Sequence, residues 1–90
     1  MDEIYKRLAA KLGYPDSEYL ARIFEYTATR RQAKILEALN QPPAPALTAE
    51  QLSEKLGLDT EVIKQELDDL FYKGLAFPRN FQDRREWRFG

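Results

Sequence analysis

The side chains with reactive groups in this 90-residue chain are carboxylates, amines, guanidiniums and hydroxyls, because the chain has no cysteine and no histidine. Those two absences exclude a disulfide, a thiolate nucleophile, a Cys/His zinc site and an imidazole base. The acidic residues fall mostly at helix starts, where capping explains them, and the neighbours Asp68 and Asp69 point to different sides of a helix. No glycine-rich phosphate loop or serine nucleophile motif occurs. We therefore expect no enzyme activity, no metal and no cofactor.

Basic side chains are the remaining candidates for recognition, and their distribution is more informative than the net charge of −1. Residues 75–90 carry four arginines against two carboxylates. Residues 48–74 carry three basic and seven acidic side chains, a net charge of −4. Affinity for nucleic acid comes mainly from cations placed on phosphates. The C-terminal segment therefore favours a nucleic-acid partner, and the segment before it does not.

Helical periodicity and capping residues account for most of the chain before residue 74. One helix follows Asp2 and ends before Gly13, and a second follows either Asp16 or Ser17, with Ile23 on its inner stripe. Capping-box patterns open a third helix at 29–39 and a fourth at 49–56, and a fifth covers 60–73 with Phe71 facing inward. The prolines between residues 40 and 46 end the third helix, and the chain reads as one domain over 1–90.

Short strands are predicted at the C-terminus. Leu75–Phe77 and Trp87–Phe89 place apolar residues two apart, which is the period of a half-buried strand. Pro78–Glu86 is polar and rich in arginine, so it reads as a hairpin loop. We expect Phe71, Phe77, Trp87 and Phe89 to pack this hairpin on the helices.

The predicted elements follow one another in an order that resembles a winged helix-turn-helix domain. The residues that carry the resemblance are Leu47–Leu58, with Gly57 and Leu58 at the turn, and Leu67–Leu75. The resemblance implies a mainly α fold with a small β-hairpin. Residues 29–89 would form the winged-helix core, and residues 1–27 would add two N-terminal helices.

Residues Tyr14–Leu20 and Asp69–Pro78 also resemble the N-terminal helical module of some 4Fe-4S ferredoxin-type proteins. In those proteins the cluster-binding cysteines lie further along the chain. Since this sequence has no cysteine, the resemblance implies a detached version of that module, without a cluster.

The first hypothesis of function is a DNA-binding domain of the transcription-regulator type. Helix 60–73 occupies the position that reads the major groove in DNA-binding relatives, and Thr60, Lys64 and Gln65 lie on its outward face. Lys64 and Gln65 would approach bases, while four arginines would hold the DNA backbone: Arg79, Arg84, Arg85 and Arg88. A solvated face of acidic and polar helix formers is the alternative interpretation of that helix.

The second hypothesis is a winged helix that binds protein and not DNA, including the case in which it is the N-terminal module of a ferredoxin-type redox protein. The N-terminal helices contain more tyrosines than the packing of such short helices requires, among them Tyr5, Tyr19 and Tyr26. Because tyrosine is enriched in protein interfaces, we expect residues 1–27 to form an interface with a partner or with a second copy of the chain. Phe81, in the middle of the predicted loop, is either a further anchor for a partner or part of the core. Apolar runs no longer than three residues predict no membrane span or signal peptide, and we expect a cytoplasmic protein.

Overall fold

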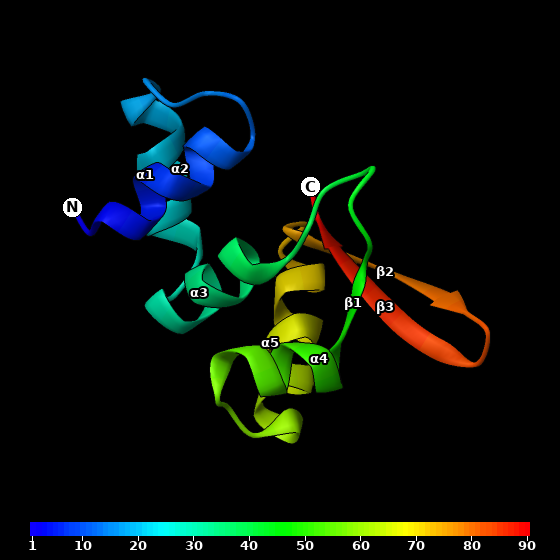
Figure 1. Cartoon of the computed structure of the whole chain (residues 1–90). Coiled ribbons are helices and arrows are strands. Elements are labelled where there is room, and N and C mark those ends of the chain that lie inside the picture. The colour runs from blue at the N-terminus through cyan, green and yellow to red at the C-terminus, as the bar shows by residue number, and fades with distance from the viewer.

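The computed structural model describes residues 1–90 as five helices and one three-stranded antiparallel sheet (Figure 1). The elements in chain order are α1 (Glu3–Lys11), α2 (Glu18–Thr27), α3 (Arg30–Ala38), β1 (Leu47–Thr48), α4 (Ala49–Leu56), α5 (Thr60–Tyr72), β2 (Ala76–Phe81) and β3 (Arg84–Phe89). The prediction of a mainly helical fold with a small β-hairpin is confirmed.

The helices begin where capping residues predict them. Ser17, and not Asp16, caps α2, because its hydroxyl accepts a backbone N–H of the first turn at 3.1 Å. Thr29 and Thr48 each form a reciprocal capping box at the start of α3 and α4. Asp59 holds the N-cap position of α5 without a side-chain capping bond.

A tight turn joins α4 to α5. Gly57 ends α4 in the left-handed region, with φ of 67°, and its N–H donates to the carbonyl of Ser53 at 2.9 Å. The Ser53 hydroxyl donates to the carbonyl of Leu58, whose side chain packs against the core. This turn brings Glu50 at the start of α4 close to Lys64 on α5.

The hairpin is longer than the sequence pattern predicts. Pro78–Phe81 and Arg84–Glu86 lie in strands, so the prediction of a loop over 78–86 is wrong. Only Gln82 and Asp83 turn the chain, with positive φ values of 50° and 66°, as a two-residue hairpin connection requires. Pro78 is accommodated because β2 is an edge strand of the sheet.

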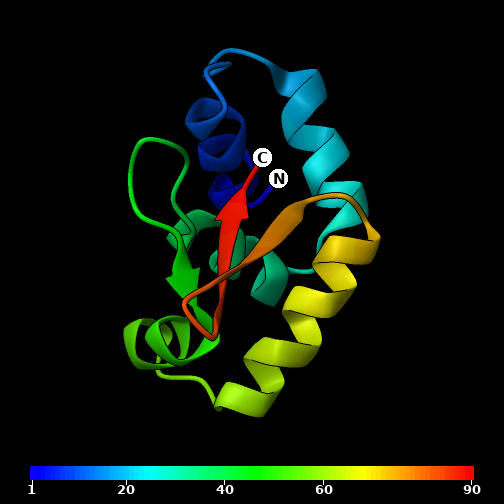
Figure 2. The ribbon, with the colours of Figure 1, turned by 90° about the vertical axis from the view of Figure 1, so that its right-hand side faces the viewer.

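Strand β3 lies at the centre of the sheet, between β1 and β2. One face of the sheet buries Ala76, Trp87 and Phe89 against the helices. The Phe89 ring makes an edge contact with Phe24 of α2, with centroids 5.8 Å apart. Figure 2 views the opposite face, with the helices behind the sheet. One apolar cluster therefore runs from α1 through to β3.

Three apolar side chains expected inside are exposed: Ile23, Phe71 and Phe77. The core-facing side of α5 is already filled by the fully buried Ile63, Leu67 and Leu70, and Phe71 lies one position further round the helix. Phe77 alternates with the buried Ala76 along β2 and therefore points to the opposite face of the sheet.

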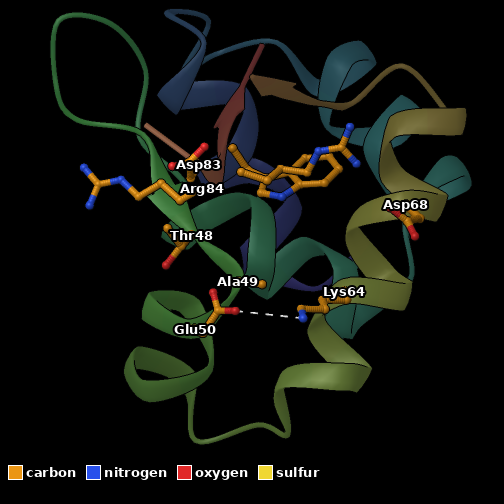
Figure 3. Close-up of a pocket in the computed structure, with 9 residues that line it drawn as sticks. Thr48, Ala49, Glu50, Lys64, Asp68, Asp83 and Arg84 are labelled. Carbon is orange, nitrogen blue, oxygen red and sulfur yellow. Dashed lines mark ion pairs between the residues drawn. The ribbon is translucent and has the colours of Figure 1, made fainter. Parts of the chain in front are cut away.

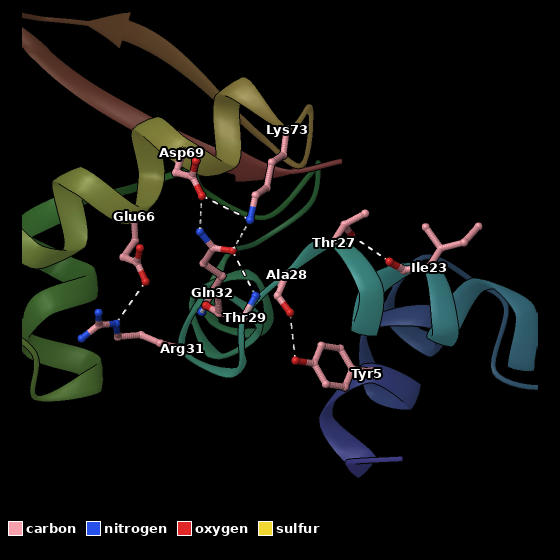
Figure 4. Close-up of polar contacts among 10 residues, drawn as sticks. All are labelled: Tyr5, Ile23, Thr27, Ala28, Thr29, Arg31, Gln32, Glu66, Asp69 and Lys73. Atoms are coloured by element: carbon pink, nitrogen blue, oxygen red, sulfur yellow. Dashed lines mark hydrogen bonds and ion pairs between the residues drawn. The ribbon is translucent and has the colours of Figure 1, made fainter.

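A polar network ties the first turn of α3 to the end of α5 (Figure 4). The buried Gln32 donates to the Asp69 carboxylate at 2.6 Å and accepts from the Lys73 ammonium at 2.8 Å. Its amide oxygen also accepts from the Thr29 N–H at 3.1 Å, within the capping box. The Gln32 amide, followed by Lys73, holds the pKa of Asp69 below its ordinary value. The network fixes the end of α5 relative to α3.

Candidate functional site

An open groove of about 620 Å³ lies between the start of α4, the middle of α5 and the far end of the hairpin (Figure 3). Side chains from residues up to 39 positions apart in the sequence meet there. The groove is lined by Thr48, Ala49, Glu50, Lys64, Asp68, Asp83, Arg84, Arg85 and Trp87.

Local hydrogen bonds and strand pairing position the walls of this groove. Thr48 ends β1 and caps α4, since its hydroxyl accepts from the Gln51 N–H at 3.1 Å. Glu50 consequently lies in the first turn of α4, where the helix dipole favours a carboxylate. Thr48 also pairs with Glu86 of β3, which places the hairpin beside the start of α4. Lys64 and Asp68, one turn apart on α5, form the facing wall.

Lys64 is held by carboxylates. Its ammonium lies 3.9 Å from a Glu50 oxygen and 3.7 Å from a Glu61 oxygen, and the first of these ion pairs crosses the groove (Figure 3). Exposed ion pairs such as these contribute little to stability. They do lower the positive potential that Lys64 offers to a ligand, and Asp68 lowers it further.

Two arginines of the hairpin share one carboxylate. Arg79 lies 3.6 Å and Arg84 3.3 Å from the oxygens of Glu86, whose side chain is only 9% exposed. Figure 3 shows the Arg84 side chain extending away from Lys64. Arg88 is engaged differently, because its guanidinium donates to the carbonyl of Ala44 at 2.7 Å.

Arg85 is the hairpin arginine whose side chain makes neither an ion pair nor a hydrogen bond. Its guanidinium lies 5.7 Å from the centre of the Trp87 ring, within range of a cation–π contact. Both residues line the groove and lie on the face of β3 that turns toward the helices. Arg85 is therefore the cation most open to an anionic ligand in the groove.

The groove gathers only part of the DNA-binding set that the sequence suggests. Lys64, Arg84 and Arg85 line it, whereas Thr60 and Gln65 lie on α5 outside it. Arg79 and Arg88 lie on strands outside its lining. The groove therefore brings together three of these seven residues.

The aromatic residues expected at a protein interface separate into two groups. Tyr5 is 7% exposed and donates its hydroxyl to the Ala28 carbonyl at 2.9 Å, so it belongs to the core and not to an interface (Figure 4). Burial raises the pKa of the Tyr5 phenol. Tyr19 and Tyr26 are exposed, the latter by 93%, and Phe81 is 45% exposed on β2.

Sequence reasoning missed several groove residues, namely Thr48, Glu50, Asp83 and Trp87. The capping box at Thr48–Gln51 was a usable signal, because it places Glu50 in an exposed first turn next to a short strand. The hairpin register, which brings Asp83 and Trp87 to the groove, has no comparable local signal.

Comparisons with protein-family models, with curated proteins and with solved structures find no match to this chain. None of the helices combines the length and the apolar composition needed to cross a membrane. No group of three or more acidic side chains lies in an arrangement that could hold a metal ion.

Proposed function

We propose that this chain is a winged-helix module whose role is to bind another protein. The order α3, β1, α4, α5 and then a hairpin supports the winged-helix assignment, since it follows the order of the family that the sequence resembles. The β1-β3-β2 sheet supports it as well, because the short strand before α4 pairs with the second strand of the hairpin.

The observation that favours a protein as the partner is the neutralisation of Lys64 by Glu50 and Glu61 in the groove. Helix α5 occupies the position of a recognition helix, yet its one central cation is surrounded by carboxylates. Phosphates would be repelled there, since DNA affinity depends on cations without competing anions. A protein surface that presents lysines or arginines complements the same residues.

We name Glu50, Glu61 and Asp68 the acidic face. Glu50 and Glu61 are well exposed at the side chain, and all three lie around Lys64 on α4 and α5. Charge complementarity of this kind governs the rate and specificity of association more than its affinity. We expect the partner to dock a basic surface on the acidic face and to bind less well as the salt concentration rises.

Tyr19 and Tyr26 on α2 support a second contact, because exposed tyrosines are enriched in protein interfaces. This contact would serve the same partner or a second copy of the chain. Sedimentation equilibrium of the wild-type chain and of a Tyr19→Ala/Tyr26→Ala variant tests the second copy: a dimer that the variant abolishes supports it, and a monomer at all concentrations excludes it.

The main experiment reverses charges on the acidic face. Wild-type chain and a Glu61→Lys/Asp68→Lys variant are used for affinity capture, and the recovered proteins are compared by quantitative mass spectrometry. A Glu3→Lys/Glu54→Lys variant, with the same charge change at two exposed positions outside the groove and outside α2, is the control. We expect a protein that wild type and control recover and the acidic-face variant loses, with direct binding verified on the purified pair. Recovery that is the same for all three chains contradicts the proposal.

Duplex DNA is the second candidate, favoured by the presence of Arg84 and Arg85 in the groove and by the net charge of +2 over residues 75–90. Fluorescence anisotropy with a mixed-sequence duplex tests it. DNA binding that weakens steeply with salt, with a smaller slope for Arg84→Ala, would support this candidate. Absence of binding at low salt would exclude it.

A further inference from the structure

The face of the hairpin that points away from the helices carries an ordered pattern of side chains. Because residues alternate along a strand, the buried Ala76, Trp87 and Phe89 leave their neighbours on the open face, which Figure 2 views. Three cross-strand pairs occupy that face, and each contains an arginine: Phe77 with Arg88, Arg79 with Glu86, and Phe81 with Arg84. We name these six residues the open face.

Two exposed phenyl rings are the first unusual feature of the open face. Phe77 and Phe81 are 43% and 45% exposed, although either ring could have been replaced by a polar side chain without loss to the core. They lie four residues apart on β2, or about 13 Å at the rise of an extended strand. Arg79 lies between them, with its guanidinium 5.5 Å from the centre of the Phe81 ring. Aromatic rings interleaved with arginines are the pattern on which unpaired bases stack.

The charge of the open face favours an anionic ligand. Its single carboxylate, Glu86, is buried beneath Arg79 and Arg84, whereas the side chains of those two arginines are more than half exposed. With Arg88, the face carries three cations for one buried anion. Each guanidinium has five N–H donors, so a contact with one carboxylate leaves donors for phosphate oxygens.

The geometry also disfavours other occupants. An added protein strand needs a continuous row of backbone donors and acceptors at the sheet edge, and Pro78 has no N–H in the middle of the edge strand β2. A duplex hides the faces of its bases, so it cannot stack on Phe77 and Phe81. A single strand presents both the base faces and the phosphates.

We propose that the open face binds single-stranded nucleic acid, with bases stacked on Phe77 and Phe81 and phosphates held by Arg79, Arg84 and Arg88. This site lies on the opposite side of the hairpin from the face that packs on the helices, and Arg84, at the edge of the groove, is the one residue that the two sites share. The proposal does not depend on the proposed protein partner. DNA and RNA share the required chemistry.

The test is fluorescence anisotropy of the full chain with labelled oligo-dT and oligo-U of about ten nucleotides, and with the corresponding dT·dA duplex, at about 50 mM salt. We expect saturable binding of at least one single strand and weaker binding of the duplex. A Phe77→Ala/Phe81→Ala variant should lose affinity by roughly tenfold or more, because each stacked base contributes substantially. The control is Tyr14→Ala/Tyr72→Ala, which removes two exposed rings from outside the hairpin and should leave the affinity unchanged.

A Glu86→Gln variant tests the electrostatic half of the proposal in the opposite direction. Loss of the shared carboxylate frees Arg79 and Arg84, so single-strand affinity should rise and its salt dependence should steepen. Circular dichroism establishes that each variant is folded. The proposal is overturned by absence of binding to both single strands, by equal binding of the duplex, or by a folded phenylalanine variant with unchanged affinity. Preference between oligo-dT and oligo-U identifies the natural ligand as DNA or RNA.

Discussion

Gln32 is a buried polar residue whose side-chain amide makes three hydrogen bonds. Its amide bonds to Asp69, Lys73 and the Thr29 backbone, so one side chain completes a helix cap and joins two helices. Its side chain is buried, and every buried polar side-chain atom in the structure has a hydrogen-bond partner. A residue in this position is costly to replace, because each lost bond leaves a group without a partner.

We predict that Gln32→Ala lowers the free energy of unfolding by about 2 kcal/mol, from the lost cap and the lost bonds to α5. Urea denaturation followed by circular dichroism measures the change. Gln65→Ala removes an exposed glutamine from a helix and should change stability by less than about 0.5 kcal/mol. Equal effects of the two substitutions would show that the network contributes nothing.

The lowered pKa of Asp69 predicts a dependence of stability on acid pH. A folded-state pKa below the unfolded value means that the carboxylate stabilises the fold fully above the unfolded value. This stabilisation is lost as the pH falls through the folded-state value, in the range below about pH 4. Asp69→Asn should therefore flatten the decline of the urea midpoint in acid. Asp68→Asn, at a position without a hydrogen bond or ion pair, is the control, and an equal flattening there would contradict the assignment.

At the scale of elements, the hairpin turn holds two residues in an unfavourable backbone conformation. Gln82 and Asp83 both have positive φ without being glycine or asparagine. Replacing the pair by Asn-Gly, the sequence that such turns prefer, should raise the free energy of unfolding by roughly 1 kcal/mol. Thermal denaturation measures the gain as a higher Tm. A lower Tm for the Asn-Gly variant would mean that the side chains of Gln82 or Asp83 stabilise the native turn.

The turn also shows which elements a sequence can predict. Helix starts depend on bonds within four residues, so Thr29, Thr48 and Gly57 were sufficient to locate α3, α4 and the end of α4. The length of the hairpin depends on pairing between strands, and neither Pro78 nor the Gln82–Asp83 turn resembles a favoured strand or turn sequence. The open face was missed for the same reason, since its pairs exist only once the register is known.

At the scale of the whole molecule, the N-terminal helices and the sheet share one core. Phe24 of α2 is buried and contacts Phe89 of the last strand. We predict that Phe24→Ala lowers the free energy of unfolding by about 3 kcal/mol, as for other large buried rings. The far-ultraviolet signal of the helices and the fluorescence of Trp87 should still change at one common urea concentration. Two separate transitions would show that residues 1–27 unfold independently.

The arrangement of charge is also a property of the whole molecule. The distribution of charge along the chain can be read from the sequence, but the ion pairs between elements cannot. Counting residues along the chain separates an acidic segment at 48–74 from a basic one at 75–90. The count does not reveal that Glu50 reaches Lys64, or that Arg79 and Arg84 share Glu86, because each contact joins different elements. Tyr5 was misplaced for a similar reason: its burial depends on how α1 packs against the end of α2.

Trp87, the one tryptophan of the chain, lies under the Arg85 guanidinium in the wall of the groove and points away from the open face. Indole emission responds to a nearby charge, so a ligand that draws Arg85 away should shift the spectrum of the unmodified protein. An oligonucleotide stacked on Phe77 and Phe81 should leave that spectrum nearly unchanged while it raises the anisotropy of its own label. The molecule therefore contains an optical probe that distinguishes, in a single cuvette, a ligand in the groove from one on the other side of the same two strands.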